Sequence, residues 1–229
     1  MRDFLYVSER KVARMAPTLP PRIAERLREL RFNAGPIGAG VVLSDRRAET
    51  AVAAVMEVEK AIYSEFQVRD VADPGLRSGD WISADATEMA YGVEPDHEAA
   101  VFIKAPSAAP PLCDPWLFLS GSAGYLLDRS VPGERVMSGM SNPQGIMKML
   151  TALEDSEPQD SLNILGDPSH AADRTGDVIT YLYRNLARLG LHPLSSLARV
   201  INIIKTERIA PFTFILGTPL LVEFAGPTV

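Results

Sequence analysis

The sequence is poor in the residues from which disulfides and metal centres are built. It holds one cysteine, Cys113, which has no partner for a disulfide within the chain. The three histidines, His97, His170 and His192, show none of the short spacings typical of zinc ligands. The acidic stretch at 94–98 offers oxygen ligands for a hard cation, but its proline and its density of charge favour an exposed turn. We therefore expect no metal site.

A hydrophobic run long enough to cross a membrane is also missing. The longest apolar stretch, at 209–225, is interrupted by Pro211, by the glycine-threonine-proline break at 217–219 and by Glu223. We interpret this stretch as two strands around a tight turn. The N-terminal residues lack the apolar core of a signal peptide. These observations predict a soluble, cytoplasmic protein with no membrane partner.

Positive charge is scarce beyond the first 47 residues. Those residues hold 10 Lys and Arg against 5 Asp and Glu, whereas residues 48–134 hold 5 against 15. An acidic middle repels nucleic-acid backbones, so we expect no nucleic-acid partner. In the basic segment at 22–31 the arginines alternate with Glu25 and Glu29 at spacings that pair on a helix. This pattern favours a solvated helix face over a phosphate-binding surface.

The rest of the composition is that of an ordinary globular protein. Hydrophobic residues make up 46% of the chain and charged residues 23%. A chain of 229 residues buries roughly 70% of its unfolded surface, so we expect residues 1–229 to form a single domain without covalent cross-links. Neither the G-x-x-x-x-G-K-[ST] motif nor the G-x-G-x-x-G motif of nucleotide sites is present, and we expect no cofactor.

Hydrophobic periodicity predicts a mixture of helices and short strands. Apolar residues recur at helical spacing in six segments, which are 8–15, 20–30, 46–66, 142–153, 173–189 and 194–205. Strand-like runs bounded by turn residues occur at 4–8, 41–43, 68–71, 81–89, 99–104, 116–119, 125–127, 212–216 and 220–224. Helices and strands do not alternate one for one, so we predict an α+β fold with an antiparallel or mixed β-sheet covered by helices. The long polar loop at 154–173 is either a lid or merely mobile.

The stretch LFLSGSAGYLL at 117–127 raises the question of a nucleophile's turn. A nucleophile elbow needs the pattern G-x-S-x-G, but Ser120 stands where the first glycine belongs. The elbow should also start a helix, and the chain reaches Pro132 too soon for a typical one. Acidic and histidine residues follow in a compatible order, so a serine hydrolase centred on Ser122 stays open as an alternative. We favour a bend between two strands.

The first strand carries polar groups on one face. Tyr6 and Ser8 are two residues apart and share that face, and Lys11 follows one turn later. Buried hydroxyls need partners, so these two either bond within the core or line a polar pocket. Together with hydroxyls elsewhere in the chain they form the candidate ligand-binding set Tyr6, Ser8, Lys11, Ser122, Tyr125 and Thr218.

Three segments resemble an actinobacterial family described only as a domain of unknown function. They are FLYVSERKV near the start, PWLFLSGSAGYLL in the middle and FILGTPLLVEFA near the end. Members of that family open with F-x-Y-V-S-x-x-K, carry a glycine-serine bend after an apolar strand, and close with V-L-G-T-P-L. The resemblance marks Tyr6, Ser8, Lys11, Gly121, Ser122, Gly217, Thr218 and Pro219. It implies no settled activity.

Two kinds of function fit these observations. The first is a protein of actinobacterial specialised metabolism that binds a small molecule or processes a metabolite without a metal or redox cofactor. If it is an enzyme, then Tyr6, Lys11 or a histidine would act as general acid or base. The second is a non-catalytic interaction module in a regulatory or defence assembly, which uses the basic segment at 22–31 against an acidic partner. A homo-oligomer is compatible with either.

Overall fold

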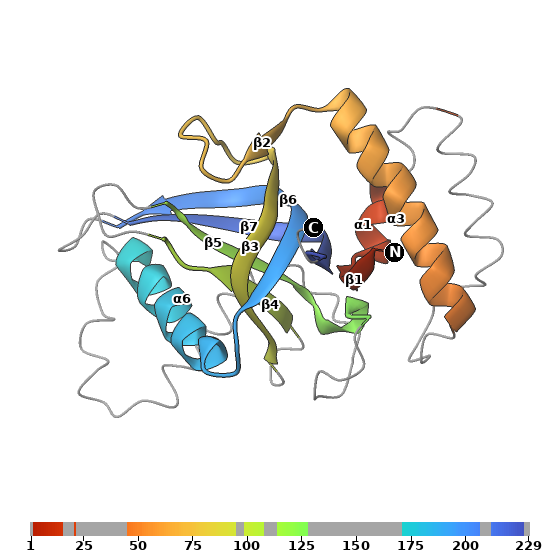
Figure 1. The fold of residues 1–229 in the computed structure, drawn as a ribbon. Helices are drawn as coiled ribbons and strands as arrows, with labels where there is room; N and C mark the ends of the chain where they lie inside the picture. Colours follow the sequence, from red (N-terminus) through yellow and green to blue (C-terminus); the bar gives the residue numbers. More distant parts are fainter. Residues whose placement is uncertain are drawn as a thin grey trace.

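The computed structural model of the chain describes residues 2–15, 21, 45–94, 99–107, 114–127, 171–206 and 212–226. Figure 1 shows these residues as a β-barrel flanked by helices. The elements in chain order are β1 (Asp3–Val7), α1 (Glu9–Met15), α3 (Asp45–Glu65), β2 (Val68–Asp70), β3 (Trp81–Glu94), β4 (Ala99–Lys104), β5 (Trp116–Ser122), the 3-10 helix η3 (Ala123–Tyr125), α6 (Ala171–Ala187), β6 (His192–Lys205) and β7 (Thr213–Phe224).

Five strands close into a barrel. Around the barrel the order is β3, β4, β5, β7, β6 and back to β3. The pairing of β5 with β7 is parallel, and the other four pairings are antiparallel. Two strands extend this sheet: β2 lies parallel to the start of β3, and β1 lies antiparallel to the end of β7. Closure pairs both edges of the barrel strands.

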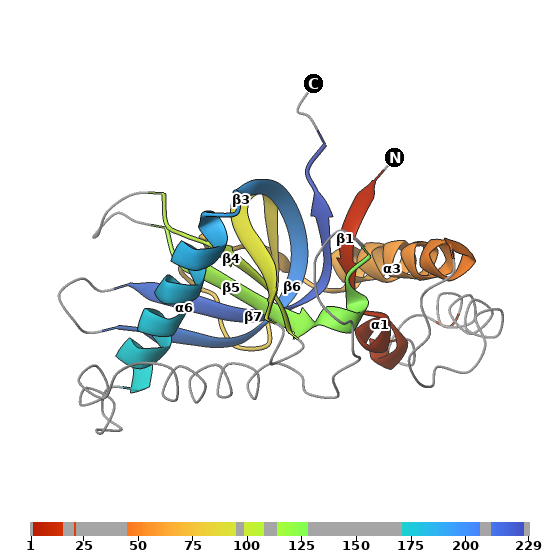
Figure 2. The same ribbon diagram turned by 90° about the horizontal axis from the view of Figure 1, so that it is seen from below.

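Side chains fill the barrel, and the helices cover its outside. The interior holds apolar residues from every barrel strand, among them Met89, Phe102, Leu119 and Ile215. Helices α1 and α3 pack on β1, β6 and β7 through Val12, Val55, Ile62, Leu197 and Leu220. Helix α6 packs on β4, β5 and β7 through Val178, Ile179, Phe118 and Leu216. Figures 1 and 2 show α3 and α6 on opposite sides of the barrel.

Several sequence-based predictions match the structure closely. The strand expected at 99–104 is β4, and the strand expected at 4–8 is β1. The helix expected at 46–66 is α3. Its residues Val55, Val58 and Ile62 form the predicted apolar stripe, and their side chains are fully buried. Phe66, which continues that stripe, lies just beyond the helix and is 45% exposed. Helix α6 ends before Gly190, which adopts φ +130°, a backbone conformation that favours glycine.

The helix expected at 194–205 is wrong, because this segment is strand β6. Leu197, Ile201 and Ile204 satisfy a helical spacing, but the segment is also rich in β-branched residues, which favour strands. Strand β6 pairs with β3 through residues 192–199 and with β7 through residues 194–205, so it lies within the barrel wall. Tertiary pairing therefore overrides the helical pattern.

The hairpin expected at 209–225 is also wrong, because β7 runs unbroken from Thr213 to Phe224. Pro219 lacks an N–H group and is normally excluded from a central strand. It is tolerated because the register against β6 shifts beside it, between Leu197 and Ala198. With β6 and β7 as long strands, the fold is mostly β. The predicted mixed sheet is confirmed, and the α+β class holds only in part.

The break in LFLSGSAGYLL lies later than expected. Strand β5 continues through Ser120, Gly121 and Ser122, and η3 follows at once. The strand expected at 125–127 is reduced to one bridge between Leu126 and Tyr6. The segments at 20–30, 41–43 and 142–153 lie outside the described residues, apart from Pro21. So does the loop at 154–173 up to residue 170, and its last residues begin α6.

Candidate functional site

One edge of β7 changes partner along its length. Residues 214–217 pair in parallel with β5, and residues 221–224 pair antiparallel with β1. The other edge of β7 pairs with β6 throughout. Residues 218–220, which we call the partner switch, therefore lie between the end of β5 and the start of the pairing with β1. Backbone carbonyls at such a gap need donors from elsewhere.

The segment after β1 supplies those donors. The backbone N–H of Ser8 donates to the carbonyl of Leu220 over 2.8 Å. The amine of Lys11 donates to the carbonyl of Pro219 over 2.6 Å and also to the hydroxyl of Thr218. The first and last motifs singled out in the sequence thus meet here, although 207 positions separate Lys11 from Thr218.

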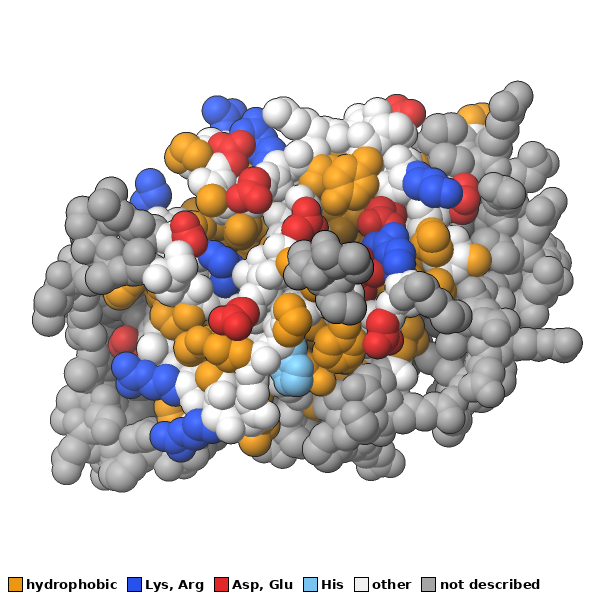
Figure 3. All heavy atoms as spheres, viewed as in Figure 1, with side chains coloured by type: hydrophobic (Ala, Val, Ile, Leu, Met, Phe, Trp, Pro, Cys, Tyr) orange, Lys and Arg blue, Asp and Glu red, His pale blue; other side chains and the backbone are white. Residues whose placement is uncertain are grey.

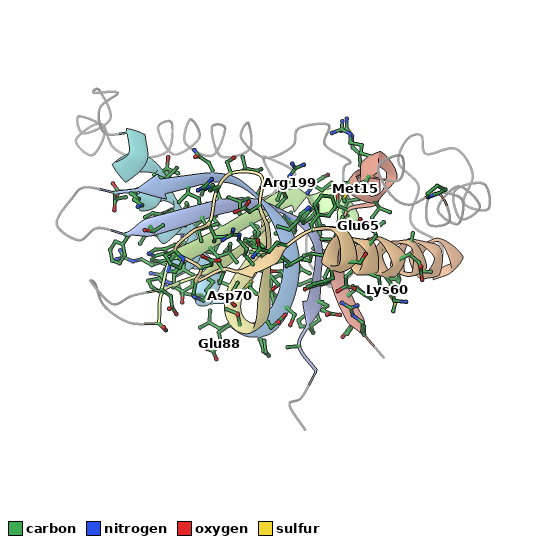
Figure 4. The ribbon with its side chains drawn as sticks, turned by 90° about the horizontal axis from the view of Figure 1, so that it is seen from above. Met15, Lys60, Glu65, Asp70, Glu88 and Arg199 are labelled. Carbon is green, nitrogen blue, oxygen red and sulfur yellow. The ribbon has the colours of Figure 1, made fainter. Side chains whose placement is uncertain are left out.

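Helix α1 aims Lys11 at the partner switch. The carbonyl of Ser8 accepts hydrogen bonds from the backbone N–H groups of Lys11 and Val12, at 3.0 and 3.1 Å, so the helix starts where the sequence predicted. Val12 packs with α3 and Leu220 in the hydrophobic cluster between the helices α1 and α3 and the outside of the barrel. Figure 4 labels Met15 on α1 and Glu65 on α3, and shows the two helices on the same side of the barrel. Lys11 is therefore held between a packed helix and the barrel wall.

The electrostatic setting of Lys11 is unusual for a lysine. Burial lowers the pKa of its amine to about 7, and no charged group among the described residues contributes to that shift. Both of its acceptors are neutral oxygens, and no carboxylate among the described residues pairs with it. Lys104 offers a contrast, because it is also largely buried but lies 3.4 Å from the carboxylate of Asp114. Lys11 therefore titrates near neutrality.

Tyr6 lies inside the barrel. Its ring makes edge contacts with Phe102 and Tyr125, at centroid distances of 5.7 and 6.1 Å. Its hydroxyl is buried and makes no hydrogen bond of normal geometry to any residue that the structure describes. Burial raises the pKa of this hydroxyl, and the Ser8 hydroxyl offsets only part of the effect. Tyr6 therefore stays protonated near neutral pH and is a poor general base.

Ser122 lies on the opposite face of the barrel wall. It pairs with Ala99 of β4, which belongs to the cluster under α6, whereas the neighbouring Gly121 faces Tyr6. Alternation along β5 thus separates Ser122 from Tyr6. Among the described residues after β5, at 123–127, the structure shows only the three-residue η3 and not the helix that a nucleophile elbow requires. Of the candidate histidines, His192 packs against the aromatic rings of Tyr91 and Phe224 instead.

The candidate residues fall into three places. Lys11 and Thr218 meet at the partner switch, where Ser8 contributes its backbone N–H, Tyr6 and Tyr125 pack in the barrel with the Ser8 hydroxyl near that of Tyr6, and Ser122 faces outwards. Sequence reasoning missed the carbonyl of Pro219 as a partner of Lys11, although a proline inside an apolar run was a signal of irregular pairing. Within the described ranges, His, Cys, Asp and Glu side chains form no group of three that could hold a metal ion.

Comparison with known proteins identifies a family. None of the helices among the described residues is long and apolar enough to span a membrane. No curated protein and no solved structure matches the chain. A family model matches residues 2–226, and its description is a family of unknown function, DUF7019. This match confirms the expected kinship with a family of unknown function. The chain belongs to the DUF7019 family.

Proposed function

We propose that this protein binds a small metabolite at the partner switch and acts on it without a metal or redox cofactor. The site consists of Ser8, Lys11, Thr218 and Pro219, which we call the Lys11 site. One observation carries the proposal: the Lys11 amine is largely withdrawn from water, and among the described residues it contacts only neutral oxygens. Perturbed ionisable groups of this kind cluster at functional sites.

A purely structural role explains this lysine poorly. Withdrawing an ammonium group from water without a countercharge costs free energy, because the ion loses its hydration. Capping the carbonyl of Pro219 does not require that cost, since a neutral serine or glutamine side chain also donates a hydrogen bond. A buried lysine that carries this desolvation cost is typical of sites where the amine itself reacts with a ligand or binds it.

The shifted amine can carry out proton transfer at neutral pH. With its pKa lowered to about 7, a substantial fraction of the Lys11 side chains is neutral at pH 7. An ordinary lysine is neutral roughly a thousandfold less often at that pH. Lys11 as a whole residue is only partly buried, and we propose that a ligand approaches the amine through this exposed part. These properties suit a general base that works by positioning, as the sequence suggests for a cofactor-independent protein.

A ligand screen tests this proposal. Metabolites from a defined library are added to the wild-type protein and to Lys11→Met, and thermal stabilisation is measured. Lys60→Met serves as the matched control, because Lys60 is an exposed lysine on α3 whose side chain is 68% accessible. We expect ligands that stabilise wild type and Lys60→Met but not Lys11→Met. Ligands that stabilise all three proteins equally, or no ligands at all, would contradict the proposal.

The interaction-module alternative keeps a separate test. Its basic segment at 22–31 lies outside the described residues. On the face shown in Figure 3, Lys and Arg side chains are scattered among acidic and apolar ones. Charge reversal at Arg22 and Arg26 with no loss of partner capture would count against this alternative. The cytoplasmic location and the role in specialised metabolism remain predictions.

A further inference from the structure

We infer that the Lys11 amine is a nucleophile and that the ligand of the Lys11 site is an aldehyde or ketone, held as an imine on Lys11. This inference rests on the proposed function and adds the chemical class of the ligand to it. It rests on the oxygens that contact the Lys11 amine and on the N–H donors that Ser8 and Pro219 do not offer to a ligand.

An anionic ligand fits this site poorly. Anion sites in proteins combine several N–H donors or more than one cation. At the partner switch, Pro219 has no N–H, and the N–H of Ser8 is already bonded to the carbonyl of Leu220. In the part of the chain that the structure describes, the groups that face the Lys11 amine are a carbonyl and a hydroxyl oxygen. The carbonyl oxygen of Pro219 would repel an anion that approached the same amine.

An aldehyde or ketone fits this site better than an anion does. Its carbon is an electrophile and needs a lone pair, which only the neutral form of an amine provides. Burial favours that form and brings the pKa of Lys11 to about 7. A carboxylate beside the amine would hold it protonated, and no carboxylate among the described residues contacts Lys11. The amine is therefore prepared for nucleophilic attack rather than for ion pairing.

The reaction balances without any further reagent. The nitrogen lone pair of neutral Lys11 attacks the carbonyl carbon, and the electron pair of the C=O bond moves to oxygen. One amine proton is transferred to that oxygen, which gives a carbinolamine. The nitrogen then forms a double bond to carbon, the hydroxyl group leaves, and with the second amine proton it forms water. The products are one imine and one water molecule.

Thr218 is a positioning residue in this scheme. Its hydroxyl accepts a hydrogen bond from the Lys11 amine and so favours the charged form. Thr218→Val keeps the branched shape and removes that acceptor. We expect the variant to move the pH midpoint of Lys11 reactivity below that of wild type. A role for Thr218 in packing alone would leave this midpoint unchanged.

Reductive trapping provides the test. The full chain is incubated with butanal and sodium cyanoborohydride between pH 6 and pH 9, and modified lysines are located by peptide mapping, which also separates the N-terminal amine. We expect Lys11 to react at least tenfold faster than the exposed Lys60 and the paired Lys104 at pH 7. Lys11→Arg, which keeps a positive charge, should lose the adduct at this position. A rate at Lys11 no higher than that at Lys60 overturns the inference.

The same experiment separates the two proposals. Library ligands that depend on Lys11 but contain no carbonyl group, together with a failure of trapping, overturn the imine and leave the proposed function standing. Carbonyl ligands from the library should block butanal trapping at Lys11 and not at Lys60. If trapping succeeds but those ligands do not compete with it, the Lys11 amine is reactive but is not the ligand's attachment point, and the inference fails.

Discussion

The hydroxyl of Tyr6 occupies the space that a side chain on residue 121 would need. A Cβ atom built on Gly121 would lie 2.8 Å from the ring carbon Cζ of Tyr6, and closer still to its hydroxyl oxygen. The glycine of the glycine-serine bend is thus explained by the tyrosine of the first strand. The two residues stand far apart in the sequence, and neither needs a ligand to account for this contact.

Gly121→Ala should strongly destabilise the protein. The added methyl group collides with a tyrosine whose side chain is 0% exposed and has no free space to move into. We expect the free energy of unfolding, measured by urea denaturation, to fall by about 2–3 kcal/mol. Gly226→Ala is the control, because a Cβ atom there meets nothing within 4 Å. Equal stability of the two variants would show that the Tyr6 side chain can shift away from the added methyl group, and it would contradict this prediction.

Tyr6→Phe should make the protein more stable. The substitution keeps the ring and its edge contacts with Phe102 and Tyr125, and it removes a buried hydroxyl that makes no normal hydrogen bond to any described residue. An unsatisfied buried hydroxyl costs about 1–3 kcal/mol, so we expect a gain of about 1 kcal/mol in the free energy of unfolding. The double variant with Gly121→Ala should recover part of the lost stability. Strict additivity of the two changes would argue against the contact.

The stability of the protein should rise with pH because of Lys11. Its pKa is about 7 in the folded protein and near 10.5 in the unfolded chain, so between these values the unfolded state binds more protons. The free energy of unfolding therefore increases as the pH rises through this window. We expect Lys11→Met to be more stable than wild type at pH 6 by about 1–3 kcal/mol, and this difference to shrink towards pH 10. Lys60→Met should show no such trend, and the same slope in both variants would contradict the assignment.

Ala86→Gly should stabilise strand β3. Ala86 adopts φ 45°, the left-handed region that suits glycine, at the point where the register between β3 and β6 shifts. Its backbone N–H donates to the Ser195 hydroxyl, and this bond survives the change. We expect a gain of about 0.5–1 kcal/mol by thermal denaturation, and a loss with Ala86→Val, since a β-branched residue is strained there. A loss with glycine would contradict the prediction.

Arg2 should contribute to the free energy of unfolding, and this contribution should depend on the salt concentration. Its guanidinium contacts the carboxylates of Glu59 on α3 and Glu223 on β7, and so connects a helix to the barrel. We expect Arg2→Met to lose about 1 kcal/mol at low ionic strength, with a smaller loss in 1 M salt. The free energy of unfolding at two salt concentrations measures this. A loss that does not change with salt would indicate that the arginine acts through packing alone.

The sequence pattern predicts local elements better than it predicts their assembly. Helix α3 was predictable because its apolar stripe is long and consistent, and β4 because its run is short and bounded. Strand β6 was not, because Leu197, Ile201 and Ile204 fit a helix equally well. The closed barrel depends on the parallel pairing of β5 with β7, which joins residues about 100 positions apart and leaves no periodic trace.

For the candidate site, too, the sequence predicted the separate residues but not how they come together. The hydroxyls of the first strand and the glycine-threonine-proline motif pointed to Lys11 and Thr218 as separate candidates. Their contact depends on a strand edge that changes partner, a feature that no local pattern encodes. The face on which Ser122 lies could not be predicted for a related reason: alternation along β5 decides which face a residue takes, and the sequence does not show where that alternation ends.

The pairing of β1 with β7 also sets an order of events in folding. Strand β1 emerges from the ribosome early, but its partner is the last strand of the barrel. The amine of Lys11 must therefore remain in water until Thr218 has been synthesised and the barrel has formed around it. Its proton affinity changes only at that late step, so the pKa of Lys11 reports completion of the fold. A chaperone-bound or stalled chain would carry an ordinary lysine.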